Sequence, residues 1–300
     1  MTKKEWLLHR LDIAECRVRL YVNANRDSLW VSRIKKLMRH PMRVLRVTLY
    51  KAGLNKKADV FVEMFWKRKL FLPLWDENVL IAYYSNSFGL VEIPLVRYLI
   101  KNMKQEDVFY DVGSSFGLYT ILAEELGAHV YSFEPNPHTV KYIMLNASPN
   151  TKVEAVAISD VSGEVEFHDT FLSNKSGMSS LFSDIASGTP RGTYDVISIP
   201  ATTLDEYIVS HEVPIIIKMD VMNADYLVFR GAKKLFTEHS PVLALRIYNT
   251  PLATPRTKMS LALLKEYGYS SYSIKEDGTL IPISIQADSL KFASTFVFKK

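Results

Sequence analysis

The feature that most constrains the fold is a regular alternation of short apolar segments with helical ones, which begins near residue 92. Strands are expected at 107–112, 129–134, 152–159, 214–220 and 241–248, and helices at 92–103, 117–127, 137–148 and 224–239. Short β-branched strands separated by helices are typical of βαβ units, whose mostly parallel sheet is buried between helices. The sequence therefore predicts an α/β protein.

The segments before and after this alternation have a different texture. Residues 5–22 and 30–54 follow a helical period, the second with a break at Pro41, and 61–84 is aromatic-rich and favours a small strand pair. Residues 269–299 are expected to add short antiparallel strands at the sheet edge. We therefore predict a basic, mainly helical region over 1–75 and an α/β domain over 76–300.

Positive charge is concentrated at the N-terminus. Residues 1–57 hold 15 Lys and Arg against 4 Asp and Glu, a net charge of +11, while residues 58–300 carry −6. A basic amphipathic face fits anionic lipid, nucleic acid or an acidic glycan carrier, although a solvated face of packed helices explains it as well. With one cysteine, no apolar run of about 18 residues and no secretory pattern, the sequence favours the cytoplasm, with peripheral contact at the inner face of the membrane as a hypothesis.

The segment "DVGSSFGLYT", residues 111–120, follows the first strand of the alternation. Gly113 and Gly117 allow backbone to approach a ligand, and Ser114 and Ser115 keep the turn small. The carboxylate of Asp111 would repel a pyrophosphate but can pair with a cationic ligand head. This turn therefore favours such a ligand over a nicotinamide dinucleotide.

Two further strand ends open on the same edge. Glu134 ends the second strand, where an acid can accept both hydroxyls of a ribose. Lys218 and Asp220 close the fourth strand, where charged residues are seldom chosen for packing alone. Asp220 can orient an acceptor hydroxyl or take its proton, and Lys218 can pair with a carboxylate.

In order along the chain, four segments resemble the FkbM family of S-adenosylmethionine-dependent methyltransferases. These are 107–148, with "DVGSSFGLYT" and "FEPNP"; 153–168, "VEAVAISDVSGEVEFH"; 177–182, "GMSSLF"; and 202–208, "TTLDEYI". The resemblance implies a Rossmann-like, seven-stranded α/β sheet and methyl transfer to an oxygen of a sugar or glycan. It also implies that Asp111 and Gly113 frame the methionine part of the cofactor, that Glu134 binds the ribose, and that Asp160 lies near the adenine.

The acceptor side departs from the family pattern. The family's K-x-D-V-E-G-A-E is here "KMDVMNAD", with Met222 and Asn223 in place of Glu and Gly, and Arg246 stands where the family usually has a Glu. We expect Asp220 and Lys218 to act in catalysis, and Arg246, His168 and Asp225 to contact the acceptor. Two cations near the reacting centre suggest an acidic acceptor such as a uronate or phosphate. No metal spacing is present.

Three alternatives stay open at this point. The basic N-terminus leaves an RNA or other nucleic-acid methyltransferase possible, although the polar-Pro-Pro-aromatic loop of base methylation is missing after the fourth strand. The altered acceptor motif leaves a non-catalytic cofactor-binding protein, and a nicotinamide dehydrogenase is the third, disfavoured by Asp111. A lipid-linked glycan as acceptor is a further hypothesis, based on the basic N-terminal face.

Overall fold

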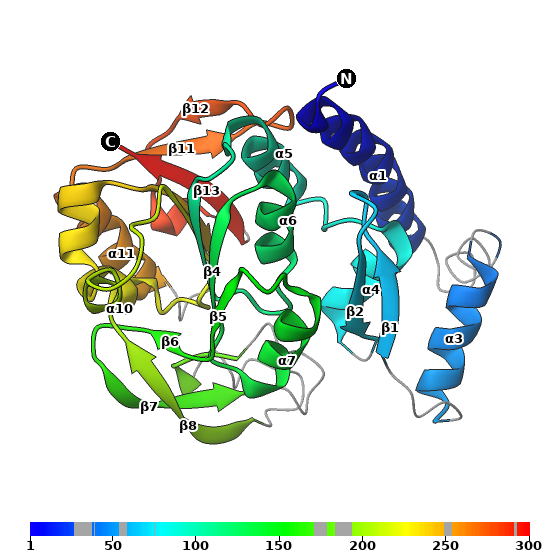
Figure 1. Cartoon of the computed structure of the whole chain (residues 1–300), viewed down its shortest axis with the longest axis horizontal. Helices are drawn as coiled ribbons and strands as arrows, with labels where there is room; N and C mark the ends of the chain where they lie inside the picture. The colour runs from blue at the N-terminus through cyan, green and yellow to red at the C-terminus, as the bar shows by residue number, and fades with distance from the viewer. Residues whose placement is uncertain are drawn as a thin grey trace. The chain divides into compact units, whose positions relative to one another are not determined.

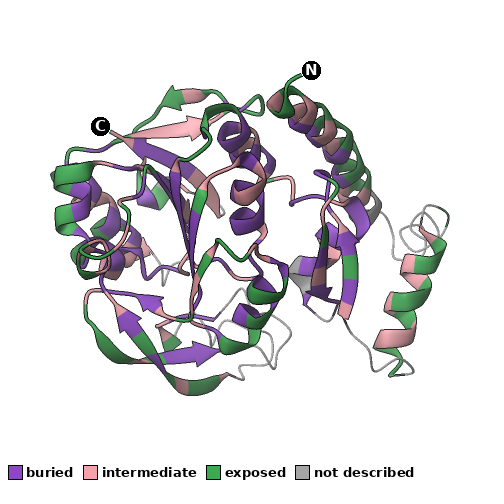
Figure 2. Cartoon of the chain, in the orientation of Figure 1, coloured by how far each residue is buried: buried purple, intermediate pink, exposed green. Residues whose placement is uncertain are grey.

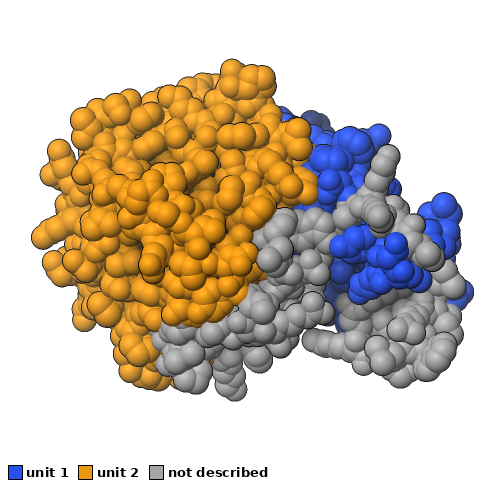
Figure 3. All heavy atoms as spheres, turned by 90° about the horizontal axis from the view of Figure 1, so that it is seen from below, with its two compact units in different colours: residues 1–100 blue, residues 101–300 orange. Residues whose placement is uncertain are grey.

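The computed structural model describes residues 1–26, 38, 40–53, 59–74, 76–170, 179–183, 194–248, 254–290 and 293–300. The first part of the predicted basic stretch at 30–54 and the start of the "GMSSLF" segment lie outside these residues. The chain divides into two compact units, 1–100 and 101–300, which Figure 3 colours separately. The predicted domain boundary, with a basic helical region over 1–75 and an α/β domain over 76–300, stays a prediction.

Unit 1 contains helices and one strand pair: α1 (Lys3–Arg26), α3 (Pro41–Lys51), β1 (Asp59–Glu63), β2 (Lys69–Pro73), α4 (Glu77–Ser85) and most of α5 (Ile93–Asn102). The buried stripe of α1 has the expected helical spacing, with Leu7, Leu11 and Val18 at 0% exposure. α3 begins at Pro41, where the sequence predicted a break, because proline is well tolerated at the first position of a helix.

The aromatic-rich stretch is only partly a strand pair. β1 and β2 are antiparallel, with Phe61 opposite Phe71, as the pattern predicted. Residues 77–85, however, form α4, which begins after Asp76, a residue with 0% exposure. The prediction of β structure there was wrong, because the β preference of aromatic residues reflects the surface on which they pack more than their backbone.

Unit 2 is an α/β unit with two sheets. Its elements are β3 (Val108–Val112), α6 (Leu118–Leu126), β4 (His129–Phe133), α7 (Pro137–Asn146), β5 (Lys152–Glu154), β6 (Ala157–Ile158), β7 (Gly163–Asp169), β8 (Asp195–Thr202), α9 (Leu204–Tyr207), β9 (Ile216–Met219), α10 (Asp225–Arg230), the π-helical turn η3 (Leu235–His239), β10 (Val242–Ile247), α11 (Thr254–Glu266), β11 (Ser270–Ile274), β12 (Leu280–Pro282), the 3-10 turn η4 (Ala287–Ser289) and β13 (Ser294–Lys299).

The larger sheet has the order β12-β11-β13-β10-β9-β3-β4-β5. The neighbours from β10 to β5 are parallel, while β13 is antiparallel to β10 and β11. Among the described residues this sheet therefore has eight strands where the resemblance implied seven, because β12 follows the turn at Asp277–Gly278. Figure 1 shows α6 and α7 on one side of this sheet and α10 and α11 on the other.

Burial explains why the strands are so apolar. Both faces of the sheet are covered, and Tyr110, Ile217 and Leu243 in its middle have 0% exposure. Figure 2 shows this buried centre surrounded by exposed helix faces. A strand covered on both sides needs a nearly continuous apolar run rather than alternation.

Two predicted elements are divided. The strand expected at 152–159 becomes β5 and then β6, which leaves the main sheet and pairs with β8 in a three-stranded sheet with β7. The helix expected at 224–239 becomes α10 and η3, with Gly231 between them. A Cβ at Gly231 would lie 2.1 Å from the carbonyl oxygen of Ser159, so only glycine permits this close approach.

Candidate active site

The site lies where the strand order reverses. β3 pairs with β4 on one side and with β9 on the other, so that Asp111 is opposite both Ser132 and Lys218. In open parallel sheets, ligands bind beyond the carboxyl ends of the strands at this switch point. The residues that the sequence singled out at the ends of β3, β4 and β9 are thereby brought to one edge.

The turn after β3 is held by close backbone contacts. Gly113 has φ +74°, and a Cβ there would lie 2.0 Å from the carbonyl oxygen of Asp220. Gly117 has φ +75° and precedes α6, whose N-terminus has no side-chain cap. The first amides of α6 are thus not occupied by a capping side chain, which suits a bound ligand.

Asp111 and Lys218 form a buried ion pair beneath this turn. The Nζ of Lys218 lies 3.1 Å from Oδ1 of Asp111 and donates to the carbonyl oxygen of Gly113 at 3.0 Å. The second carboxylate oxygen of Asp111 accepts a hydrogen bond from Thr120 at 2.8 Å. Asp111 has 0% exposure, so its charge is compensated inside the protein and the pair supports the turn from below.

Small hydroxyl side chains continue this support. Thr120 Oγ1 lies 3.0 Å from Ser132 Oγ, and Ser132 Oγ donates to Ser114 Oγ at 2.8 Å. Ser114 is buried, whereas Ser115 has φ +53° and presents its backbone amide to the next strand. The two serines therefore play different parts in the same turn.

Glu134 links the β3 turn to the end of β4. Its Oε2 accepts from the amide of Ser115 at 2.7 Å, and its Oε1 accepts from the amide of Asn136 at 3.0 Å. Burial raises the pKa of Glu134 to about 7, against the lowering effect of these hydrogen bonds. The side chain of Thr139 lowers this pKa as well. A carboxylate has about four acceptor sites, so Glu134 keeps capacity for a ligand hydroxyl.

Asp160, expected near the adenine, follows β6. Its Oδ2 lies 3.2 Å from the guanidinium of Arg230 at the end of α10. This pair stands beside the close contact between Gly231 and Ser159. Its place near an adenine stays a prediction.

Asp220 is the partly accessible carboxylate of the site. Its side chain is 23% exposed, and its Oδ2 accepts from the hydroxyl of Tyr248 at 3.3 Å and lies 3.8 Å from Nε of Arg246. Burial raises the pKa of Asp220, with Lys218 acting in the opposite direction. Asp225, at the start of α10, is 2% exposed, and burial followed by the charge of Asp220 raises its pKa to about 8.

The loop between β9 and α10 has an unusual backbone. Met222 and Asn223 both have positive φ, +47° and +66°. Left-handed geometry is costly for Met and better tolerated by Asn, so the two departures from the family motif fall on strained positions. The hydroxyl of Ser180 donates to the carbonyl oxygen of Met222 at 3.1 Å and holds this conformation.

Several buried acceptor atoms at this loop have no hydrogen-bond partner among the described residues. They are Oδ1 of Asp220, Oδ1 of Asn223 and Oδ1 of Asp225. Buried polar atoms in folded proteins are nearly always paired, so these oxygens have acceptor capacity that the described residues do not fill. His168, on β7, also has an unpaired Nδ1, and its ring packs against Tyr194 with centroids 5.1 Å apart.

Sequence reasoning missed the residues that support the site from neighbouring strands. Tyr248 lies two positions after Arg246 in an extended segment. Side chains two positions apart in such a segment point to the same side, so the sequence could have placed Tyr248 beside Arg246. Thr120 and Asp169 gave no sequence signal, since their partners are distant along the chain. Among the described residues, no group of three or more His, Cys, Asp or Glu side chains could hold a metal ion.

The strand order and this site define the class of the protein. The order β5-β4-β3-β9-β10 is the 3-2-1-4-5 arrangement of Rossmann-like folds, here with Asp111 at the end of β3 and Glu134 directly after β4. The profile described as "Methyltransferase FkbM domain" matches residues 107–271, more than half of the chain. The chain belongs to the FkbM methyltransferase family. This confirms the predicted class, a methyltransferase, and the predicted cofactor, S-adenosylmethionine.

Similarity to individual proteins is more distant. The chain is 28% identical over 146 residues to a protein named hexuronic acid methyltransferase AglP from Haloferax volcanii, covering 47% of this chain and 56% of that protein. It thus spans little more than half the length of this curated relative. Among solved structures, a methyltransferase FkbM from Methylobacillus flagellatus is 15% identical, with a TM-score of 0.42 over 66% of this chain and 44% of the other. TYW2 of M. jannaschii in complex with AdoMet is 11% identical, with a TM-score of 0.36 over 82% and 86%.

Proposed function

We propose that the protein transfers the methyl group of S-adenosylmethionine to a hydroxyl of a sugar, and that this sugar is a uronic acid. The observation that carries the proposal is the partly exposed Asp220, which stands beside Arg246 and next to buried, unpaired acceptor oxygens of Asn223 and Asp225. The named function of the Haloferax volcanii relative, a hexuronic acid methyltransferase, supports it.

The chemistry of the site fits a polyhydroxylated acid. Sugar hydroxyls supply the donors that the unpaired oxygens of the 220–225 loop require. The guanidinium of Arg246 suits a carboxylate, which it can bind through two parallel hydrogen bonds. Lys218 is engaged by Asp111 and Gly113, so we assign it to holding the cofactor turn rather than the acceptor.

The cofactor side of the protein also fits. Glu134 has acceptor capacity for a ribose, and the start of α6 has no side-chain cap, so its first amides can meet a ligand. Bound S-adenosylmethionine supplies an electrophilic methyl group. The acceptor oxygen forms the new O–C bond as the S–C bond breaks, and Asp220 takes the hydroxyl proton late in the step. Its raised pKa suits this role, because a base is most effective when its pKa approaches the working pH.

The test is methyl transfer from labelled S-adenosylmethionine to oligosaccharides that end in glucuronic acid or in glucose. We expect turnover with the acid, and Arg246→Gln should lower kcat/KM for the acid at least tenfold while changing the slow glucose reaction little. Lys265→Gln on the exposed face of α11 is the matched loss of charge and should have no effect. Equal turnover of the two acceptors by the wild type would contradict the uronic acid assignment.

Asp220→Asn separates catalysis from binding. We expect kcat to fall at least 100-fold, within the range for a lost general base, while S-adenosylhomocysteine affinity stays within about threefold. Undiminished turnover would remove Asp220 from the role of base. Cofactor binding without turnover of any sugar in the wild type would favour the non-catalytic alternative, and salt-sensitive RNA methylation would favour the nucleic-acid alternative.

We further propose that the basic N-terminal region contacts an anionic membrane, where a lipid-linked acceptor would be presented, on the cytoplasmic side. α3 supports this, since it has no buried residue and exposes Met42 and Leu45 at 73% and 48% beside Arg46 and Lys51. A basic helix with exposed apolar side chains is the pattern of an interfacial helix. No helix in the described part of the chain is long and apolar enough to cross a membrane.

A further inference from the structure

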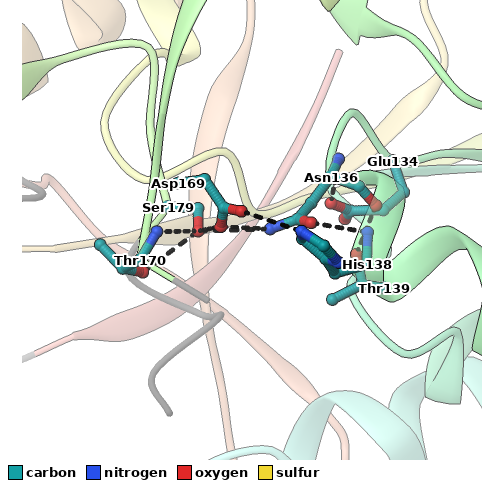
Figure 4. Close-up of polar contacts among 7 residues, drawn as sticks. All are labelled: Glu134, Asn136, His138, Thr139, Asp169, Thr170 and Ser179. Atoms are coloured by element: carbon teal, nitrogen blue, oxygen red, sulfur yellow. Dashed lines mark hydrogen bonds and ion pairs between the residues drawn. The ribbon is translucent and has the colours of Figure 1, made fainter. Parts of the chain in front are cut away.

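A buried polar network joins the end of β4 to the end of β7. Asn136 Nδ2 donates to Asp169 Oδ1 at 2.7 Å, and Ser179 Oγ donates to the same oxygen at 3.1 Å (Figure 4). The amide of Thr170 donates to Ser179 Oγ at 3.0 Å. We call Asn136, Asp169, Thr170 and Ser179 the Asn136–Asp169 network.

At one end, this network fixes the residue that we assign to the ribose. Asn136 uses all its polar groups: its amide N–H donates to Glu134, its side-chain oxygen accepts from the amide of His138 at 2.9 Å, and its side-chain nitrogen donates to Asp169. A residue held at three points has one orientation. Through Glu134 this orientation extends to the amide of Ser115 in the β3 turn.

At the other end, the network reaches the strained loop of the acceptor side. Ser180 directly follows Ser179, pairs with His168 through two backbone hydrogen bonds of 2.8 and 3.1 Å, and donates its hydroxyl to the carbonyl oxygen of Met222. A change in the conformation of segment 179–180 would therefore alter the hydrogen bond to Met222, in the loop that contains Asn223 and Asp225.

Burial makes the geometry demanding. Asn136 is 1% exposed, Asp169 4%, Ser179 9% and Ser180 1%. A carboxylate in such surroundings is costly unless hydrogen bonds compensate its charge, and here charge-assisted bonds come from Asn136 and Ser179. Apolar side chains would fill this space at lower cost, so the polar arrangement points to a requirement for orientation rather than for packing alone.

We propose that Asn136, Asp169 and Ser179 are positioning residues that couple cofactor binding at Glu134 to the order of the acceptor loop. A cofactor that fixes Glu134 and Asn136 thereby restrains Ser179, Ser180 and the carbonyl of Met222, and the acceptor meets a loop that is already ordered. Because such coupling is reciprocal, an ordered acceptor loop also strengthens cofactor binding. This inference concerns the order of binding and does not depend on which sugar is methylated.

The experiment uses the full chain and S-adenosylhomocysteine as the probe, so no acceptor is needed. Hydrogen–deuterium exchange is followed in peptides covering 113–117, 179–183 and 220–225, and affinity is measured by calorimetry. In the wild type we expect the ligand to slow exchange in all three segments. No slowing in 179–183 would overturn the proposal, whereas failure of sugar methylation alone would not touch it.

Swapping the side chains of Asn136 and Asp169 tests the network directly. Asn136→Asp keeps the α7 cap but sets two carboxylates against each other, and it should weaken S-adenosylhomocysteine binding about 10-fold or more. Asp169→Asn removes the charge and should weaken binding about 3- to 10-fold. The double variant restores one donor and one acceptor in reversed order, so affinity should return to within about threefold of the wild type.

Exchange in 179–183 should become independent of ligand in both single variants and dependent again in the double variant. Met144→Gln is the control, because Met144 lies on the same helix, α7, is 58% exposed and is not part of the network. Losses in the double variant that equal the sum of the single losses would overturn the proposal, as would a Met144→Gln loss as large as that of Asn136→Asp. If Asn136→Asp does not fold, Asp169→Asn alone is the test. Exchange in 179–183 that no longer responds to the ligand supports the proposal, and exchange that the ligand still slows as in the wild type overturns it.

Discussion

At the scale of single residues, two buried carboxylates of the site differ in how their negative charge is compensated. Asp111 is neutralised by Lys218 beneath the cofactor turn. Glu134 is held by neutral donors, the amides of Ser115 and Asn136, and burial outweighs them and raises its pKa to about 7. Both carboxylates lie at the ends of strands of the same sheet, yet one is paired with a cation and the other is held by neutral donors.

Glu134 should make cofactor binding depend on pH. Between the ordinary glutamate pKa of 4.5 and the raised pKa of about 7, the folded protein holds a proton on Glu134 that the unfolded chain releases. The contribution of this group to the free energy of unfolding therefore falls as pH rises through that window. Ligand affinity should change in the opposite sense, since only the ionised carboxylate accepts both ribose hydroxyls.

We expect S-adenosylhomocysteine affinity, measured by calorimetry, to weaken by up to about tenfold per pH unit below 7. Glu134→Gln should bind more weakly at pH 8 and lose this pH dependence. An unchanged pH profile in Glu134→Gln would show that another group controls binding.

Lys218 should matter chiefly for stability. Lys218→Met leaves Asp111 buried without its cation, and removal of one partner of a buried pair typically costs about 3–5 kcal/mol. Urea unfolding measures this loss of stability. Adding Asp111→Asn should recover most of it, because the amide oxygen can still accept from Thr120. A double variant that is less stable than Lys218→Met would contradict the assignment of Asp111 and Lys218 as an ion pair.

At the scale of elements, the loop from β9 to α10 combines backbone strain with unpaired acceptor atoms. Met222 and Asn223 have left-handed backbone, and Oδ1 of Asn223 is buried without a partner among the described residues. Strain of this kind persists where the surrounding structure enforces it and is common at functional sites. Ser180 provides such enforcement here.

Asn223→Gly should weaken acceptor binding while keeping or raising the stability of the protein. Glycine adopts φ +66° without strain and removes a buried unpaired oxygen, so we expect the free energy of unfolding to stay equal or rise by about 1 kcal/mol. KM for the uronic acid acceptor should rise, because a hydroxyl partner is lost. Asn223→Ala is the control and should be destabilised by about 1–2 kcal/mol at this φ; an unchanged acceptor KM in both variants would remove Asn223 from the acceptor site.

At the scale of the whole molecule, the excess of positive charge and the residues of the proposed active site lie in different parts of the chain. Residues 1–57 carry a net charge of +11, while the residues of the proposed chemistry all lie beyond residue 100. The segment that would contact a membrane is therefore distinct from the segment that would transfer the methyl group, and variants can address the two separately.

Vesicle binding tests the proposed role of α3. We expect the protein to sediment with phosphatidylcholine vesicles only when phosphatidylglycerol is present, and to be released by high salt, which screens surface charge. Replacing the exposed Met42 and Leu45 by Asp should abolish sedimentation and leave S-adenosylhomocysteine affinity unchanged. Val209→Asp, at an 82% exposed valine, is the matched control; equal loss in that variant would contradict a specific contact.

The sequence by itself determined the α/β class, the mostly parallel sheet and the methyltransferase family, and it predicted the strand ends where the cofactor would bind. These follow from local signals: apolar runs for strands buried on both faces, and glycines and acids at strand ends, as in 111–117 and at Glu134. The family motif also allowed the departures at Met222, Asn223 and Arg246 to be recognised before any contact was known.

Only the tertiary structure decided how these side chains are used. Whether Lys218 faces an acceptor or Asp111 depends on β9 lying beside β3, and whether Asn136 meets Asp169 depends on β7 leaving the main sheet with β6 and β8. The division at Gly231 likewise follows from its contact with Ser159, which is 72 positions earlier in the chain. Local patterns specify strands and turns because backbone preferences act over a few residues, whereas partners of buried charges are set by strand order, which no local pattern records.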